Sequence, residues 1–311
     1  MTDRQSTESK KGEIEFRRKL VQQQVDGKCI FPDEFGRIDM ERILADRMKK
    51  TVDQMTLLRK CGITLSPYVE IGAERCQRSL VMEHDLNAAG AAVDISYDML
   101  RSCDYYSGIF ARSRLPLRVC GDANSLPFMS DSVPFVFCYE TLHHFPDPAP
   151  IIKEVYRILS PGGCFFFDEE PYRRTLHLNL YKRKKAYSSE SLNRGKIRRI
   201  FDRFFSQVNC NEVNHGVCEN DSISIAVWRR ALSCFEEKNV RLQSTKHIHS
   251  DLFSPQNQAQ FLLAFLFGGQ ISGTCFKSGV NVECRSVQDV IVCPACIESG
   301  RELRLASVVR H

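Results

Sequence analysis

Three acidic residues lie at the ends of successive apolar segments. Glu70 precedes Gly72 in the string YVEIG, Asp94 ends AAVD, and Asp122 follows LRVCG. Short apolar segments that alternate with helical spacing predict parallel strands, whose carboxyl ends meet at one edge of a sheet. Nucleotide-like ligands bind at such an edge, where glycine lets them approach the backbone and carboxylates accept hydrogen bonds from ribose hydroxyls or an exocyclic amine. The sequence therefore predicts one ligand site built from these three carboxylates.

Two histidines and a run of acids follow later strand-like segments. His143 and His144 come after the apolar residues 133–139, and an acidic run, residues 168–170, ends the next apolar segment. Histidine titrates near neutrality, so either one is a candidate general base. The alternative interpretation is structural, with one ring packed on the proline turn and the other bonded to backbone. The acids are equally well explained as pocket walls, and His215 is a candidate lid residue.

The C-terminal cysteines are candidate zinc ligands. Cys293 and Cys296 stand in CPAC, and two thiolates at this spacing can share one tetrahedral zinc ion. Cys284 and Cys275 are the thiols that could complete the site, with eight intervening residues in each gap. The alternatives are a metal-free turn and a site shared with another chain. A redox role is disfavoured because no thioredoxin-like strand-to-helix setting surrounds the pair.

The composition predicts a globular protein. The chain has 311 residues, and 43% of them are apolar, which is ample material for a core. Its longest purely apolar run, residues 261–267, is far shorter than the roughly 20 residues of a membrane-spanning helix. The polar N-terminus lacks the apolar stretch of a secretory signal. We therefore expect a cytoplasmic protein whose cysteines are mostly reduced core residues.

Positive charge is concentrated in one segment. The net charge is only +5, yet residues 172–203 hold eleven basic and two acidic side chains, with aromatic residues interleaved. Such a run is commonly a solvated helix face. The functional alternatives are a site for an acidic or phosphorylated small substrate and a surface for RNA, although no RNA-binding module signature is present.

Hydrophobic periodicity predicts alternating strands and helices. The strands are expected at residues 68–71, 91–95, 117–120, 133–139, 164–168, 239–245 and 270–276. The helices are expected at residues 39–61, 79–87, 151–159, 223–237 and 258–267, the last of them buried. This order is typical of an α/β fold with helices on both faces of a mainly parallel sheet.

Four strings of this chain resemble class I S-adenosylmethionine-dependent methyltransferases, most of all the branch with the ubiquinone and menaquinone biosynthesis methyltransferases. The strings are VEIGAERCQRSL, AAVDISYDML, GDANSLPFMSDSVPFVFCYETLHHFPDP and EVYRILSPGGCFFF, and they span about residues 67–168. The most specific part is residues 122–163, where LPF, LHHF and LSPGG occur in the family's order and spacing. One departure is that Glu74 and Cys76 stand where the family usually has glycines.

The resemblance implies a Rossmann-like seven-stranded methyltransferase sheet whose last strand is antiparallel, here residues 269–276. It also implies S-adenosylmethionine as cofactor. The implied binding residues are Glu70, Gly72 and Ala73 for the methionine end, Asp94 and Ile95 for ribose and adenine, Asp122 and Ala123 for the adenine edge, and Tyr139 near the sulfonium.

The predicted organisation has six parts. They are a disordered tail (1–12), a helical segment (13–62), the S-adenosylmethionine-binding core (63–171), a basic helical cap (172–222), the C-terminal part of the sheet (223–282) and the cysteine-containing tail (283–311). The predicted function is methyl transfer from S-adenosylmethionine to a small-molecule acceptor. The alternatives are an RNA methyltransferase that uses the basic segment, and a catalytically inactive, methyltransferase-like partner protein.

Overall fold

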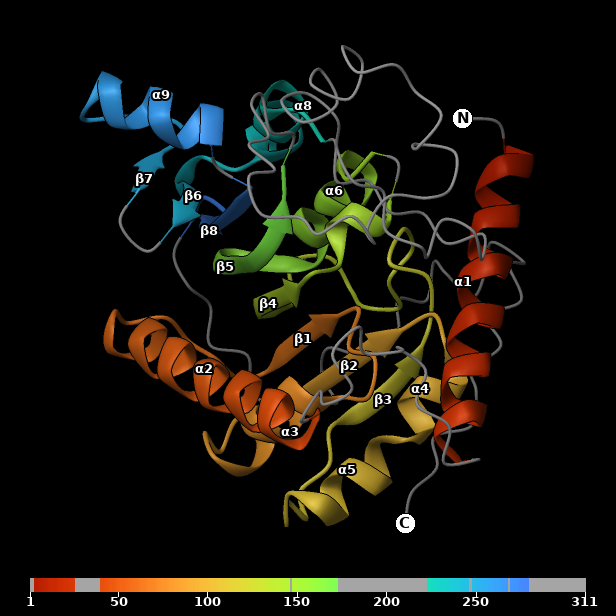
Figure 1. Ribbon diagram of the computed structural model, residues 1–311. Coiled ribbons are helices and arrows are strands. Elements are labelled where there is room, and N and C mark those ends of the chain that lie inside the picture. Colours follow the sequence, from red (N-terminus) through yellow and green to blue (C-terminus); the bar gives the residue numbers. More distant parts are fainter. Residues whose placement is uncertain are drawn as a thin grey trace.

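One eight-stranded sheet organises the chain (Figure 1). The computed structural model describes residues 3–25, 40–145, 147–172, 223–245, 248–267 and 269–279. The strands are β1 (Tyr68–Ile71), β2 (Gly90–Asp94), β3 (Leu117–Cys120), β4 (Val133–Tyr139), β5 (Leu159–Pro171), β6 (Glu237–Thr245), β7 (Ile248–Asp251) and β8 (Gln270–Phe276). The helices are α1 (Asp3–Val25), α2 (Met40–Lys60), α3 (Gln77–His84), α4 (Tyr97–Arg101), α5 (Cys103–Ile109), α6 (Ala149–Ile158), α8 (Ile225–Ala231) and α9 (Gln258–Phe267), with the 3-10 turns η1 (Leu142–His144) and η5 (Leu232–Cys234).

The strand order is β3-β2-β1-β4-β5-β8-β6-β7. Strands β1 to β5 pair in parallel, whereas β8 lies antiparallel between β5 and β6. The antiparallel last strand predicted at residues 269–276 is therefore confirmed. The sheet has eight strands rather than the expected seven because β7 adds a short antiparallel edge strand to β6.

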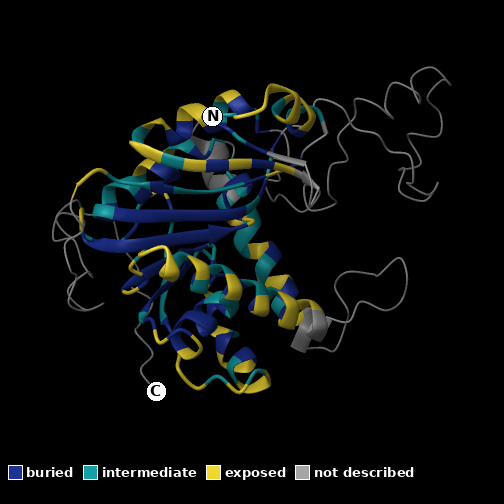
Figure 2. Cartoon of the chain, turned by 90° about the vertical axis from the view of Figure 1, so that its left-hand side faces the viewer, coloured by how far each residue is buried: buried dark blue, intermediate teal, exposed yellow. Residues whose placement is uncertain are grey.

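Side chains of the central strands alternate between two cores. Strands β1 and β4 are buried along their whole length, as expected for parallel strands covered on both faces (Figure 2). On one face, Phe135 and Phe137 pack with Tyr68 under α2 and α3. On the other face, Val136 and Phe165 pack under α6 and α8. Both faces of β1 and β4 thus exclude water.

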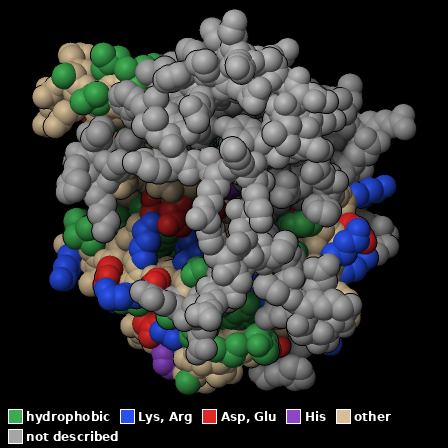
Figure 3. Space-filling model, viewed as in Figure 1, with side chains coloured by type: hydrophobic (Ala, Val, Ile, Leu, Met, Phe, Trp, Pro, Cys, Tyr) green, Lys and Arg blue, Asp and Glu red, His purple; other side chains and the backbone are tan. Residues whose placement is uncertain are grey.

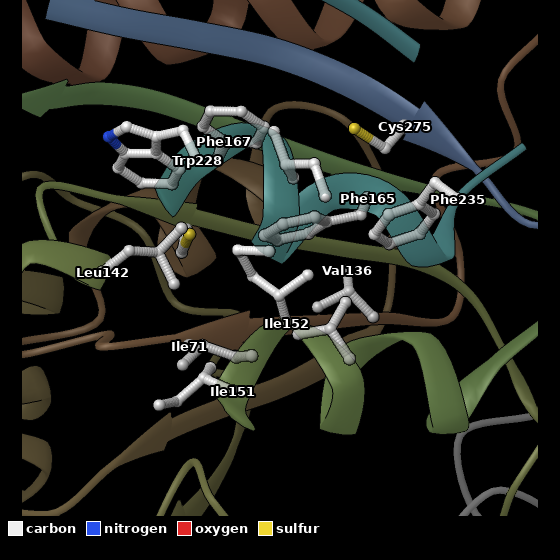
Figure 4. Close-up of a cluster of buried hydrophobic side chains, with 14 of the residues drawn as sticks. Ile71, Val136, Leu142, Ile151, Ile152, Phe165, Phe167, Trp228, Phe235 and Cys275 are labelled. Carbon is white, nitrogen blue, oxygen red and sulfur yellow. The ribbon is translucent and has the colours of Figure 1, made fainter. Parts of the chain in front are cut away.

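The second core joins the C-terminal half of the chain to the parallel strands (Figure 4). Trp228 of α8 stacks on Phe167 of β5 with ring centroids 5.8 Å apart and planes 2° from parallel. Phe235 stacks in the same way on Phe165, at 6.0 Å. Helix α6 contributes an apolar stripe that includes Ile151 and Ile152, which agrees with the amphipathic helix predicted at residues 151–159.

Three sequence-based expectations differ from the structure. Residues 1–12 were expected to be a disordered tail, but α1 begins at Asp3, and its Phe16 and Leu20 bury against Met99. Helix α9 was expected to be buried, but Leu262 and Leu263 are 53% and 42% exposed. The helix predicted at residues 223–237 ends earlier, because the chain passes through η5 into β6.

No helix in the described ranges has both the length and the apolar character that crossing a membrane requires.

We predict that Trp228→Ala lowers the free energy of unfolding by about 3–5 kcal/mol, because it removes a fully buried ring that stacks on β5. Chemical denaturation of both proteins measures this difference. The control is Leu263→Ala on the exposed side of α9, which we expect to change stability by no more than about 0.5 kcal/mol. Equal stability of Trp228→Ala and the wild type would show that α8 is not part of the core.

Candidate active site

The three predicted acids lie at neighbouring strand ends. Glu70 is in β1, Asp94 ends β2, and Asp122 follows β3, and these strands are adjacent and parallel. The backbone also joins them, since Ala73 N donates to Val93 O at 3.0 Å and Gly121 N donates to Asp94 O at 2.9 Å. The carboxyl edge of β1, β2 and β3 therefore brings the predicted cofactor residues into one region.

Asp94 organises the loop that follows β1. Its Oδ2 accepts from Glu74 N at 2.9 Å, and its Oδ1 accepts from Ser96 N at 2.8 Å. Glu74 and Cys76 have positive φ angles of 46° and 60°, the left-handed conformation that favours glycine. Each such residue costs about 1–3 kcal/mol. The loop therefore keeps a glycine-like backbone without the family's glycines, held by the Asp94 carboxylate.

Gly72 also has a packing role. We predicted that its missing side chain lets a ligand approach the backbone. In the structure its φ is +68°, and a Cβ atom there would overlap the side chain of Thr141. Thr141 Oγ1 in turn donates to Tyr139 O at 2.8 Å. Gly72 thus permits close contact between the loop after β1 and the loop after β4.

Burial raises the pKa of two of these carboxyls. Glu70 is 3% exposed, and burial raises its pKa to about 7 although Ser79 Oγ donates to it at 2.5 Å. Burial likewise raises the pKa of Asp94 to about 6, against backbone hydrogen bonds that favour the charged form. Burial therefore favours the neutral form of both acids, and a positive charge bound beside them would favour the carboxylate.

Helix α1 supplies cations to this edge. Lys10 Nζ lies 2.5 Å from Asp122 Oδ2, and Arg17 Nη1 lies 2.6 Å from Glu74 Oε1. Burial opposes ionisation of Asp122, but hydrogen bonds from Lys10 and Asn124 outweigh it and lower its pKa. The Lys10 contact was not expected because residues 1–12 were predicted to be disordered, and the Arg17 contact was not expected although residues 13–62 were predicted to be helical. The seven-residue spacing of Lys10 and Arg17, two turns of one helix face, was the available signal.

A second cluster of polar side chains lies at the ends of β4 and β5. Tyr139, predicted near the sulfonium, is 5% exposed, and its hydroxyl donates to Gln54 Oε1 at 2.8 Å. Gln54 Nε2 donates to Asp168 Oδ2 at 2.6 Å. Burial raises the pKa of the Tyr139 phenol, so this hydroxyl is a hydrogen-bond donor near neutral pH.

Ion pairs between helices and strand ends complete this cluster of polar side chains. Lys50 Nζ lies 2.7 Å from Asp168 Oδ2 and 2.8 Å from Glu169 Oε1. Arg78 Nη2 lies 3.1 Å from Glu169 Oε2, and its guanidinium carbon lies 3.8 Å from the centroid of the Tyr139 ring. Acidic and basic side chains are accordingly intermixed on this face (Figure 3). The spacing of Lys50 and Gln54, one helical turn beside the apolar stripe of α2, would have pointed to them.

Glu170 fixes the position of His143. The carboxylate is fully buried and accepts from the backbone nitrogens of Thr141, Leu142 and His143 at 2.7, 2.9 and 3.1 Å. His143 Nδ1 lies 3.0 Å from Glu170 Oε2. A carboxylate that accepts from every neighbour favours a proton on Nδ1, which makes Nε2 the basic nitrogen of the neutral ring.

The histidine pair lies close to the candidate site. The rings of His143 and His144 are 4.3 Å apart, and His144 acts electrostatically on Glu74 while His143 acts on Glu140. Of the three acids near the end of β5, Asp168 and Glu169 pair with residues of α2 and α3, whereas Glu170 holds the turn η1.

Three further predicted cofactor residues and one predicted zinc ligand lie within the described residues. Ala73 and Ala123 are buried beside the strand ends, and Ile95 is half-buried with its carbonyl facing Cys120 Sγ at 3.5 Å. Cys275 is a buried free thiol of β8, with Cys164 as an electrostatic neighbour.

The zinc prediction concerns a region that is mostly not described. Three predicted ligands, Cys284, Cys293 and Cys296, lie outside the described residues, as do His215 and residues 173–203 of the basic segment. Among the residues that are described, no group of three or more His, Cys, Asp or Glu side chains is arranged to hold a metal ion.

Residues 69–167 match a family described as a methyltransferase domain. An uncharacterized chloroplastic methyltransferase of Arabidopsis thaliana is 35% identical over 91 residues, which cover 28% of this chain and 25% of that protein. Malonyl-[acyl-carrier protein] O-methyltransferase of a Marinomonas species is 27% identical over 135 residues, covering 43% of this chain and 44% of that protein. The chain thus spans less than half the length of these curated relatives.

Solved structures with similar folds include the [4+2]-cyclase SpnF, with a TM-score of 0.49 and 15% identity over 88% of this chain and 97% of that one. Another is a methyltransferase-like protein of Bacillus halodurans, with a TM-score of 0.43 and 15% identity over 73% of this chain and 100% of that one.

We predict that protein stability falls as pH rises from about 4.5 to 7.5, in part through Glu70. Its pKa is higher in the folded protein than in the unfolded chain, so the unfolded chain binds fewer protons in this window and is favoured as pH rises. Glu70→Gln keeps an oxygen that accepts from Ser79, and it should remove roughly 3 kcal/mol of this pH dependence. Urea denaturation at several pH values measures the slope.

The matched control is Glu15→Gln on the exposed side of α1, which should leave the slope unchanged. An identical slope in Glu70→Gln and the wild type would contradict the assignment of a raised pKa to Glu70.

Proposed function

We propose, on the premise that residues 69–167 form a class I S-adenosylmethionine-dependent methyltransferase domain, that the whole chain transfers a methyl group from S-adenosylmethionine to a small-molecule acceptor. The observation that carries this proposal is the placement of Glu70, Asp94 and Asp122 at the ends of adjacent parallel strands.

The donor set fits the cofactor. Carboxylates are pure acceptors, and the polar edge of S-adenosylmethionine presents donors: an ammonium group, two ribose hydroxyls and an adenine amine. Glu70 with Gly72 and Ala73 would hold the methionine end. Asp94 would hold the ribose, because each of its oxygens has a second lone pair beyond the one used by backbone. Asp122 and Ala123 would hold the adenine edge, with Ile95 flanking the ring.

The chemistry divides between cofactor and protein. When bound, the cofactor supplies a methyl group that its sulfonium has already activated. The protein then has to orient the acceptor and exclude water. Two polar residues of α2, Lys50 and Gln54, reach the ends of β4 and β5 near Tyr139. They form the side of the site where the methyl acceptor would bind.

His143 takes a proton where the acceptor needs one removed. Glu170 holds its Nδ1–H, so the Nε2 atom is the base. A base at this position suits an acceptor whose hydroxyl or amine must lose a proton.

Calorimetry with S-adenosylmethionine and S-adenosylhomocysteine tests the proposal. We expect both to bind and compete for one site. If the folded protein gave no binding with either ligand, the proposal would be wrong and an inactive partner protein would be favoured. Bound RNA that survives purification, with affinity lost in moderate salt, would favour an RNA acceptor instead.

We predict that Asp94→Asn weakens S-adenosylhomocysteine binding by about 1–3 kcal/mol, because the amide loses one of the acceptor oxygens. The control is Asp53→Asn on the exposed side of α2, which should bind as the wild type does. Unchanged affinity in Asp94→Asn would rule out its role in ribose binding.

We also predict that Lys10→Met strengthens S-adenosylhomocysteine binding several-fold. Lys10 Nζ lies against Asp122 Oδ2, in the place where we expect the adenine amine, so its removal opens that position. Lys19→Met is the matched control, because Lys19 lies on the same helix and pairs with Glu15. Weaker or unchanged binding in Lys10→Met would show that α1 does not compete with the cofactor.

A further inference from the structure

We infer that Arg78 binds the α-carboxylate of the cofactor's amino-acid end and so makes the site selective for S-adenosyl ligands that carry this carboxylate. The inference rests on the proposed function, and it concerns a residue that the sequence analysis did not single out. Arg78 is the second residue of α3, directly after the loop that follows β1.

The guanidinium of Arg78 has an unused donor. Its Nε–H is buried and has no hydrogen-bond partner within the described part of the chain. The side chain as a whole is only 13% exposed. A buried donor without a partner costs free energy, and that cost is largest for a charged group. Most buried polar groups in proteins are paired, so this atom points to a missing acceptor.

The two contacts that Arg78 makes do not involve Nε. Nη2 donates to Glu169 Oε2 at 3.1 Å, and the guanidinium carbon lies 3.8 Å from the centroid of the Tyr139 ring. These two contacts fix the plane of the group without engaging Nε. An arginine held in this way is pre-organised to receive a carboxylate, whose planar oxygens match the guanidinium edge.

The charges around Arg78 match an amino acid. Arg78 acts electrostatically on the buried Glu70, and the next residue, Ser79, donates to Glu70. A cation and an anion therefore lie close together at the end of β1. The amino-acid end of the cofactor carries an ammonium and a carboxylate, so Glu70 suits the first and Arg78 the second.

The alternative is that Arg78 only joins α3 to Glu169 and Tyr139. A purely structural arginine would affect all ligands of the site equally. A carboxylate-binding arginine affects only ligands that have the carboxylate, and this difference can be measured without knowing the methyl acceptor.

The experiment compares two ligands that differ in one group. They are S-adenosylhomocysteine and its decarboxylated analogue, S-adenosyl-3-thiopropylamine, which keeps the adenosine, the sulfur and the amine. Calorimetry gives both dissociation constants for the wild type, Arg78→Met and Arg78→Lys. We expect the wild type to prefer S-adenosylhomocysteine on the order of ten- to hundred-fold, and Arg78→Met to bind the two ligands with nearly equal affinity. Arg78→Lys should keep part of the preference, because its charge remains while the planar donor edge is lost.

Arg75→Met is the matched control. Arg75 lies in the same loop and also stacks on a tyrosine, Tyr106, with its guanidinium carbon 5.3 Å from the ring centroid. It should keep the wild-type preference. Circular dichroism and thermal denaturation establish that each variant is folded.

The outcomes separate this inference from the function on which it rests. If the wild type binds S-adenosylhomocysteine but does not prefer it over the analogue, the inference is wrong and the proposed function stands. The same holds if folded Arg78→Met loses affinity for both ligands by one common factor. If the wild type binds neither ligand, the proposed function fails and the inference fails with it. Should Arg78→Met not fold, the wild-type preference and Arg78→Lys still decide.

Discussion

The candidate site depends on one clamp, the two hydrogen bonds that Asp94 accepts from Glu74 N and Ser96 N. They join the loop after β1 to the loop after β2 and hold Glu74 in a left-handed backbone that costs free energy, two residues before Cys76, which has the same backbone conformation. The same loop leads directly into α3, which carries Arg78 and Ser79. The Asp94 bonds therefore act at the start of the segment that carries Arg78 and Ser79, whose own side chains contact Glu169, Tyr139 and Glu70.

Helices and strands that show a regular local pattern of apolar residues were predictable from the sequence. The bounds of β1, β3 and β4 agree with the predicted segments because each is a short apolar run limited by polar or glycine residues. The three acids were predictable for the same reason, since the end of a strand fixes the position of its last side chain.

Residues that act through distant partners were not predictable. Glu170 lies near the end of β5, but its role comes from the turn η1, some 27 residues earlier in the chain. Lys10 reaches Asp122 across 112 positions, and although its spacing from Arg17 marks one helix face, that spacing does not identify the partner. The exposed apolar side of α9 shows the converse, because an apolar run predicts burial only where another element covers it.

A crystal structure of the protein with S-adenosylhomocysteine would locate the cofactor site. We expect the ligand at the ends of β1, β2 and β3, with ribose oxygens roughly 3 Å from the Asp94 carboxylate and the adenine edge at Asp122 in place of Lys10. A ligand bound elsewhere on the chain, with the contacts of Glu70, Asp94 and Asp122 unchanged, would contradict this expectation.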